Sequence, residues 1–283
     1  MQVELDRIFE QIPTNSQFLA LFRGASDSVL DIYGKVNQGV VYKADNSPQT
    51  QADRASNTLI VQFLQRNTPY SILSEESGVS EDFTADCFWI VDPLDGTRDF
   101  MEKTGEFSIM IALVASGRPI FGAVYQPTME KCYIAREGKG AFLIDAKELS
   151  SRLNVSGSSE LSKMRMVVSR NRTKGTDLEV AKRLGVGGLI EHGSFGLKVG
   201  LIAEGKTDLF LNSGAHTSIW DSAPNIVILK EAGGMLTDLN GQELLVDPNI
   251  RANMNGVVAS NGQNHLEIVA QIREIVNQIR LQG

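Results

Sequence analysis

Two aspartates close an apolar run in the first third of the chain. Residues 88–97 read Phe-Trp-Ile-Val-Asp-Pro-Leu-Asp-Gly-Thr, so a run typical of a buried strand ends in Asp92 and Asp95. Carboxylates at such a turn suit a hard divalent cation. A helix that opened after Gly96 and Thr97 would offer free N–H groups to an anion beside the cation. Metal next to phosphate indicates phosphoester hydrolysis, although Asp-Pro and Asp-Gly are also ordinary turn pairs.

Two further acidic segments have the same character. Residues 72–78 read Ile-Leu-Ser-Glu-Glu-Ser-Gly, so Glu75 again follows an apolar stretch, although adjacent glutamates alone usually mark a solvated loop. Residues 219–223 read Ile-Trp-Asp-Ser-Ala, and Asp221 precedes the apolar run 226–232. Taken alone, Asp221 is as well explained as a helix N-cap. These segments form one metal site only if the fold brings them together.

Apolar periodicity predicts a β-rich first half with two helices. The helices are expected at 15–34 and 52–67, where apolar residues recur on one face. A hairpin-like connection is expected at 117–119, Gly-Arg-Pro. The predicted strands are 70–73, 88–92, 107–115, 120–126 and 131–136.

After about residue 155, short strands alternate with helices. The strands are expected at 167–168 and 209–211, and the helices at 176–184, 196–204, 222–232 and 265–281. Gly187-Gly188 is interpreted as a turn. Strand–helix alternation is typical of α/β domains. The predicted fold class is therefore α/β (α+β), with sub-domains 1–155 and 156–283 and the site in the cleft between them.

The composition is that of a globular protein with an acidic excess. The chain has 283 residues, 42% of them hydrophobic, a mean hydropathy of −0.10 and a formal net charge of −7. The net charge argues against a nucleic-acid polymer as partner, because affinity for the phosphate backbone needs clustered Lys and Arg. Divalent ions would invert the field of an acidic cluster, so a small phosphorylated metabolite should bind only with metal.

Targeting signals are not expected in this sequence. No apolar stretch approaches the length of a transmembrane segment, and residues 1–7 lack the apolar core of a signal peptide. Two cysteines, Cys87 and Cys132, do not form a disulfide framework and are interpreted as packing residues. A cytoplasmic location is therefore predicted, and monomer and homodimer both remain open.

Four segments resemble the inositol monophosphatase-like superfamily in order and spacing. They are Ser-Glu-Glu-Ser at 74–77, the metal motif from Trp89 to Thr97, Trp-Asp-Ser-Ala at 220–223 and Glu-Ala-Gly-Gly at 231–234. The resemblance runs from about residue 43 to about residue 245. It implies a layered αβαβα sandwich and a magnesium-dependent, lithium-sensitive phosphomonoesterase.

The resemblance implies two Mg²⁺ ions and a weaker third. The first ion would be bound by Glu75, Asp92 and the backbone carbonyl of Leu94. The second would be bound by Asp92, Asp95 and Asp221, and the third by Glu75 and water. This ligand set agrees with the preference of magnesium for oxygen.

Thr97 and Asp53 are implied to be the pair that activates the attacking water. In the family the aspartate bonds the threonine hydroxyl, which orients the water together with Glu75 for in-line attack. The N–H groups of Gly96 and Thr97 are expected to hold the phosphate. From the residues alone, Asp53 is also explained as a helix N-terminal charge and Thr97 as a helix cap.

Three features resemble the 3'(2'),5'-bisphosphate nucleotidase branch. They are Lys-Ala-Asp-Asn-Ser-Pro at 43–48, Gly-Glu-Phe-Ser at 105–108, and Leu197-Lys198, where the lysine faces a nucleotide phosphate. The predicted reaction is hydrolysis of the 3'-phosphate of 3'-phosphoadenosine 5'-phosphate to AMP and phosphate. The substrate-binding residues implied by the resemblance are Asp95, Gly96, Thr97, Gly196, Lys198 and Asp221.

Other segments depart from the nucleotidase pattern. Residues 169–172 read Ser-Arg-Asn-Arg where that branch has Ser-Arg-Ser-His, and 192–196 is more similar to the inositol monophosphatases. Against inositol phosphate, Gly214 stands where those enzymes carry a glutamate that binds ring hydroxyls. Inositol-1-monophosphatase and fructose-1,6-bisphosphatase activities are the alternatives.

A non-catalytic regulator that binds phosphorylated metabolites is the alternative of another class. Such a relative would be expected to lack at least one of Glu75, Asp92, Asp95, Thr97 and Asp221. All five are present, which favours the enzyme. The histidines show no zinc spacing; His216 is expected in a surface loop and His265 facing solvent.

Overall fold

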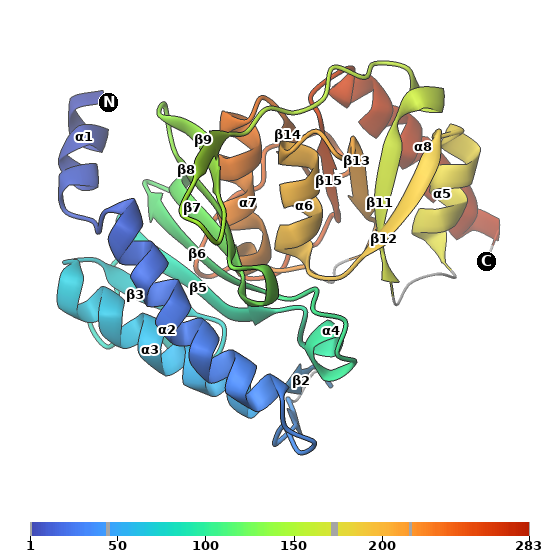
Figure 1. Cartoon of the computed structure of the whole chain (residues 1–283). Coiled ribbons are helices and arrows are strands. Elements are labelled where there is room, and N and C mark those ends of the chain that lie inside the picture. Colours follow the sequence, from blue (N-terminus) through green and yellow to red (C-terminus); the bar gives the residue numbers. More distant parts are fainter. Residues whose placement is uncertain (1, 44–45, 171–174, 215–216, 283) are drawn as a thin grey trace.

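A computed structural model describes residues 2–43, 46–170, 175–214 and 217–282, and these form five alternating layers (Figure 1). Helices α2 and α3 cover one face of an eight-stranded sheet. Helices α6 and α7 lie between that sheet and a five-stranded sheet, and α5 and α8 cover the far face of the latter. This is the expected α/β fold with the layered αβαβα arrangement.

The first helical layer consists of α2 (Asn15–Tyr33) and α3 (Gln51–Asn67), preceded by α1 (Gln2–Glu10). Both α2 and α3 begin with a capping box, in which an N-cap threonine and the residue three positions later bond each other's backbone. Their apolar faces pack on the first sheet, where the rings of Phe18 and Phe121 stack with centroids 4.7 Å apart.

The first sheet has the strand order β10-β9-β8-β7-β6-β5-β3-β4, and only β3 and β5 pair in parallel. Its strands are β3 (Ser71–Ser74), β4 (Gly78–Val79), β5 (Cys87–Asp95), β6 (Ser108–Ala115), β7 (Arg118–Gln126), β8 (Lys131–Arg136), β9 (Gly140–Ile144) and β10 (Ser150–Arg152). The β6–β7 hairpin turns at Ser116-Gly117, one residue before the predicted connection. Both turn residues have positive φ (50° and 74°), as a two-residue type I′ loop requires.

The second sheet has the order β12-β11-β13-β15-β14, with β12, β11 and β13 parallel. Its strands are β11 (Arg165–Ser169), β12 (Gly188–His192), β13 (Leu209–Asn212), β14 (Met235–Thr237) and β15 (Val257–Ser260). The helices around it are α5 (Thr176–Leu184), α6 (Phe195–Ala203), α7 (Ile219–Glu231) and α8 (His265–Gln282). Two smaller pieces near the site are the β1–β2 pair (Val41–Tyr42, Pro48–Gln49) and α4 (Thr97–Met101).

Helix α7 lies directly on the backbone of the first sheet. A Cβ at Gly122 of β7 would stand 2.3 Å from the carbonyl oxygen of Pro224, so only glycine permits this approach. Pro224 lies inside α7, at the sixth residue of the helix, where it lacks the N–H that would otherwise bond the carbonyl of Trp220. The contact brings the N-terminal end of α7 to the end of β5.

Two predictions about the second half of the chain were wrong. Gly188 opens β12 and is not part of a turn. His265 is only 2% exposed and not solvent-facing, because its ring nitrogens bond the hydroxyls of Thr237 (2.8 Å) and Ser260 (2.7 Å). His216 lies outside the described residues.

The two sheets are built from different parts of the chain, since the strands of the first end at Arg152 and those of the second begin at Arg165. The sub-domain boundary at residue 155 stays a prediction. Within the described ranges, no helix has the length and apolar character that crossing a membrane requires.

Candidate active site

An irregularity in β5 shapes the end of the predicted metal motif. The pairing of β5 with β6 shifts register between Asp92 and Asp95, as at a β-bulge, which re-aims side chains at a strand end. The N–H of Leu94 donates to Asp92 Oδ1 at 3.0 Å. Asp92 is 2% exposed and Asp95 9%, so the bulge holds two adjacent carboxylates inside the protein.

Asp221 joins this pair from the opposite side. It is the third residue of α7 rather than its N-cap, and its carboxylate accepts the N–H of the N-cap residue Ser218 at 2.6 Å. Carboxylate oxygens of Asp92, Asp95 and Asp221 lie within 4.8 Å of one another. Burial, with repulsion from neighbouring carboxylates, raises the pKa of Asp92 and of Asp221 well above the usual range. Three clustered carboxylate oxygens fit a hard cation such as magnesium.

Glu75 lies beside this trio and is held by a lysine. It follows β3, and its N–H donates to the carbonyl of Val91 on the parallel strand β5 at 3.0 Å. Lys43 Nζ lies 2.8 Å from Glu75 and 2.7 Å from Glu76. Burial raises the pKa of Glu75, and the charge of Lys43 offsets this only in part. Lys43 thus carries a positive charge into the acidic site.

Asp53 and Thr97 meet as predicted. Asp53 is the third residue of α3, and its Oδ2 accepts the N–H and hydroxyl of Thr50 at 2.7 and 2.5 Å. Its Oδ1 lies 3.3 Å from Thr97 Oγ1, which also lies 3.2 Å from the carbonyl of Leu94. Burial raises the pKa of Asp53 to about 6. Asp53 therefore caps a helix and also faces the threonine, while its role in activating water stays a prediction.

One oxygen of Asp95 is occupied by hydrogen-bond donors from α6 and β6. Asp95 Oδ2 accepts the hydroxyl of Ser194, the N–H of Gly196 at 2.9 Å and the hydroxyl of Ser108 at 3.4 Å. Gly196 was predicted to bind substrate, but its N–H is engaged with Asp95. A Cβ there would lie 2.5 Å from the sulfur of Met110, so it is packed against the first sheet.

A cavity of about 680 Å³ opens over these residues. Lys198 on α6 lines it although only 5% exposed, with Nζ 5.3 Å from the ring centroid of Phe210. The lysine is therefore a buried cation in the wall and not a solvated residue. The predicted site residues that line the cavity are Glu75, Asp95, Gly96, Thr97, Lys198 and Asp221.

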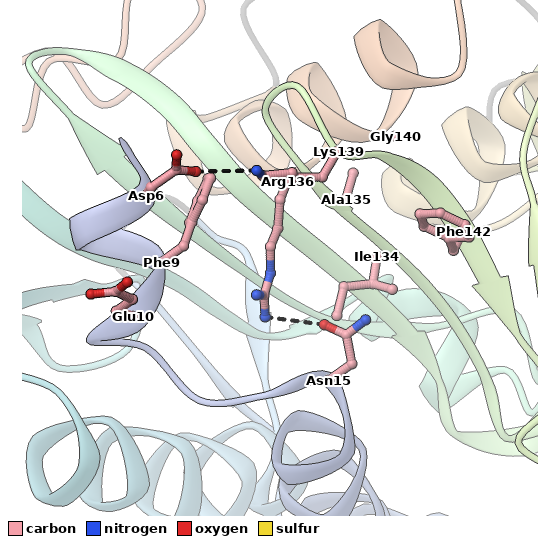
Figure 2. Close-up of a pocket in the computed structure, with 10 residues that line it drawn as sticks. All are labelled: Asp6, Phe9, Glu10, Asn15, Ile134, Ala135, Arg136, Lys139, Gly140 and Phe142. Atoms are coloured by element: carbon pink, nitrogen blue, oxygen red, sulfur yellow. Dashed lines mark hydrogen bonds and ion pairs between the residues drawn. The ribbon is translucent and has the colours of Figure 1, made fainter. Parts of the chain in front are cut away.

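A second cavity, of about 590 Å³, lies between α1 and the β8–β9 hairpin (Figure 2). Arg136 crosses it and donates to the carbonyl of Pro13 and to Asn15 Oδ1, both at 3.1 Å, while Lys139 pairs with Asp6 at 3.1 Å. These contacts tie the α1–α2 connection to the sheet. None of the predicted site residues lines this cavity.

The comparisons with known proteins agree with this geometry. The inositol monophosphatase family matches residues 15–277. The chain belongs to that family. It is accordingly a phosphatase, with an acidic cluster that could hold a metal.

Family members with different activities are similar to the chain. The 3'(2'),5'-bisphosphate nucleotidase CysQ of Escherichia coli (strain K12) is 36% identical over 236 residues, which are 82% of this chain and 93% of that protein. The inositol-1-monophosphatase of Mesorhizobium japonicum is 32% identical over 223 residues, 76% of this chain and 81% of that protein. The solved structure of the Thermotoga maritima IMPase has a TM-score of 0.78 and 27% identity, covering 93% of this chain and 98% of that chain.

Three residues of this inositol monophosphatase-family site were not predicted from the sequence to have a role. Glu106 and Arg170 form an ion pair at the cavity, and Ser194 bonds Asp95. Ser194 is the N-cap of the observed helix α6, a position that serine prefers, but the helix was predicted to begin at 196, one residue too late to mark Ser194 as its cap. Glu106 belongs to a segment that resembles the nucleotidase branch, but its partners come from the other half of the chain. Arg172 lies outside the described residues.

Proposed function

We propose that this phosphatase hydrolyses the 3'-phosphate of 3'-phosphoadenosine 5'-phosphate, giving AMP and phosphate, with magnesium as cofactor. The observation that carries the proposal is the buried Lys198 in the wall of the cavity that Asp95 and Asp221 of the acidic trio also line. Its charge acts on Asp221, since it opposes the rise in that residue's pKa. A substrate with two phosphates needs a cation besides the metal, and Lys198 supplies one.

The donors for magnesium would be the carboxylates of Glu75, Asp92, Asp95 and Asp221 and the carbonyl of Leu94. When bound, magnesium supplies the positive charge that stabilises the phosphoryl oxygens and the leaving oxygen. Lys43 already pairs with Glu75 and Glu76, so it balances part of the negative charge of the acidic site.

Thr97 orients a water molecule in this proposal. Asp53 is predominantly ionised at neutral pH, since its pKa is about 6, and it is an acceptor for the Thr97 hydroxyl. When Thr97 donates to Asp53, the lone pairs of its Oγ1 accept a hydrogen bond from water on the cavity side. The protein thereby positions the nucleophile against the bound phosphate.

Release of phosphate by the purified protein tests the substrate. We would compare 3'-phosphoadenosine 5'-phosphate, inositol 1-phosphate and fructose 1,6-bisphosphate with magnesium and with a chelator. A preference for the nucleotide of about 100-fold in kcat/KM, about 2.7 kcal/mol, is expected. A preference for inositol 1-phosphate would contradict the substrate assignment, and no turnover of any phosphate would favour the regulator.

Lys198→Met tests the role of the lysine. The matched substrate is 3'-AMP, which lacks the 5'-phosphate. We expect the variant to lose about 10- to 100-fold in kcat/KM on the bisphosphate, as a lost charge-assisted contact would cost, and little on 3'-AMP. Lys147→Met, on an exposed loop, is the control. Equal losses on both substrates would show that Lys198 does not recognise the second phosphate.

A further inference from the structure

The carboxylate of Glu106 holds two strand ends of the second sheet. It lies between α4 and β6, and its two oxygens each lie 2.7 Å from Arg170 Nη2. Its Oε2 also accepts the N–H of Gly193 at 2.7 Å. Arg170 directly follows β11 and Gly193 directly follows β12, which are parallel neighbours. One side chain of the first half therefore fixes the ends of two strands beside the cavity.

Gly193 is packed so closely that no side chain would fit there. A Cβ on it would stand 2.4 Å from Asp99 Cγ and 2.6 Å from the carbonyl oxygen of Glu106. The next residue, Ser194, has φ 54° and ψ 136°, a left-handed φ that is strained for a side chain other than glycine. Such a conformation persists only when its surroundings impose it. The hydrogen bond from Gly193 N–H to Glu106 fixes the backbone directly before Ser194.

Ser194 in turn determines how Asp95 is oriented. Its hydroxyl donates to Asp95 Oδ2, and its Oγ accepts the N–H of Leu197 at 3.2 Å. Because Gly196 N–H and Ser108 also contact Oδ2, that oxygen has its full set of donors. Only Oδ1 is left for a cation.

We infer that Glu106 is a positioning residue, which holds the Asp95 carboxylate in its metal-binding orientation through Gly193 and Ser194. This inference rests on the metal assignment of the proposed function and not on the identity of the substrate. Loss of Glu106 removes the constraint on Ser194, and the Asp95 carboxylate, left with the donors Gly196 N–H and Ser108, is then held less firmly. The affinity for a divalent cation falls before any substrate is present.

Direct binding of Mn²⁺ to the substrate-free protein, followed by electron paramagnetic resonance of the free ion, measures this effect. We expect Glu106→Ala to weaken Mn²⁺ binding about tenfold and to lower kcat, with KM little changed. Glu106→Gln keeps an acceptor for Gly193 and should lie between Ala and wild type. It also keeps the test possible if the alanine variant does not fold. Ser194→Ala should weaken Mn²⁺ binding as well, and the double variant with Glu106→Ala should lose no more, because both act on one carboxylate.

Glu191→Gln is the control. Glu191 lies on β12, and its carboxylate is 3.9 Å from Arg170. Among the described residues, its side chain makes no hydrogen bond to Gly193. The variant should bind Mn²⁺ as wild type does. Wild-type Mn²⁺ affinity in both Glu106 variants would overturn the inference, and so would a rise in KM alone. Hydrolysis of a phosphate other than the nucleotide would refute the proposed substrate and leave the inference standing. Failure of the wild type to bind Mn²⁺ would overturn the inference and the metal assignment together.

Discussion

Thr97 Oγ1 lies 3.3 Å from Asp53 Oδ1, although the two residues are 44 positions apart. The other oxygen of Asp53 is occupied by the backbone and hydroxyl of Thr50. The capping box of α3 therefore sets the direction of the oxygen that faces Thr97. One carboxylate therefore serves two purposes: one oxygen of Asp53 caps α3, and the other contacts Thr97 across the site.

The Thr97 hydroxyl should be needed for turnover rather than for folding. We expect Thr97→Val, which keeps the shape of the side chain, to lower kcat about 100-fold, because a positioned proton-transfer group contributes that much. Thr97→Ser keeps the hydroxyl and should lose no more than about tenfold. Steady-state kinetics with magnesium measures both. A Thr97→Val enzyme with the kcat of wild type would remove Thr97 from the mechanism.

Removal of one carboxylate from the buried trio should stabilise the protein without metal. Asp221→Asn keeps an oxygen to accept the Ser218 N–H but removes the repulsion among the buried carboxylates, which helps to raise the pKa of Asp92 and of Asp221. We expect the melting temperature in a chelator to rise by about 2–4 °C, as a gain of about 1 kcal/mol produces in a chain of this size. Thermal denaturation in EDTA measures the change.

With magnesium, the wild type should have a higher melting temperature than Asp221→Asn. A ligand that binds only the folded state raises stability by mass action, so millimolar Mg²⁺ should raise the melting temperature of wild type. Asp221→Asn should show little shift, and its turnover should be abolished. If both proteins respond equally to Mg²⁺, Asp221 is not a ligand.

His265 should make stability depend on pH in the acid range. Burial lowers its pKa to about 4 in the folded state, from the ordinary value of 6.5. As the pH falls below 6.5, the unfolded chain takes up a proton that the folded protein rejects, so stability is lost between pH 6.5 and pH 4. The loss is at most about 3 kcal/mol.

His265→Gln isolates this contribution from the other titrating groups. Glutamine can replace one hydrogen bond to Thr237 or Ser260 and has no titrating ring. Urea denaturation at steps from pH 7 to pH 4 should give a stability difference between wild type and variant that shrinks as the pH falls. A constant difference would show that His265 takes up its proton equally in both states.

Gly122→Ala should weaken the contact of α7 with the first sheet. Its Cβ would stand 2.3 Å from Pro224 O, a backbone atom that cannot turn aside, so we expect a loss of about 2 kcal/mol or more. Gly24→Ala is the matched control, because Gly24 is exposed within α2 and nothing lies within 4 Å of its added Cβ. It should stabilise the protein by about 0.5–1 kcal/mol. Thermal denaturation that placed Gly122→Ala at or above wild type would contradict this packing.

Elements with strong apolar periodicity could be predicted from the sequence pattern. Helix 176–184 was predicted at its observed bounds, and the helices near 15–34 and 52–67 within a residue, because an apolar face recurs along each. Strands β9, β10, β12, β14 and β15 were not predicted. β10 and β12 are mostly exposed, so no buried face marks them. β9 and β15 do contain apolar residues, but runs this short do not distinguish a strand from other buried segments.

The set of residues that share the site follows from the packing of the layers and not from the sequence pattern. The residue types and their order in the sequence indicated that Asp92, Asp95 and Asp221 could bind a metal. Their carboxylate oxygens lie within 4.8 Å of one another because α7 packs on β7 at Gly122. The bond of Glu106 to Gly193 spans 87 residues, and burial of His265 depends on Thr237 and Ser260. Periodicity reports which face of an element is apolar, whereas packing between layers decides what covers that face.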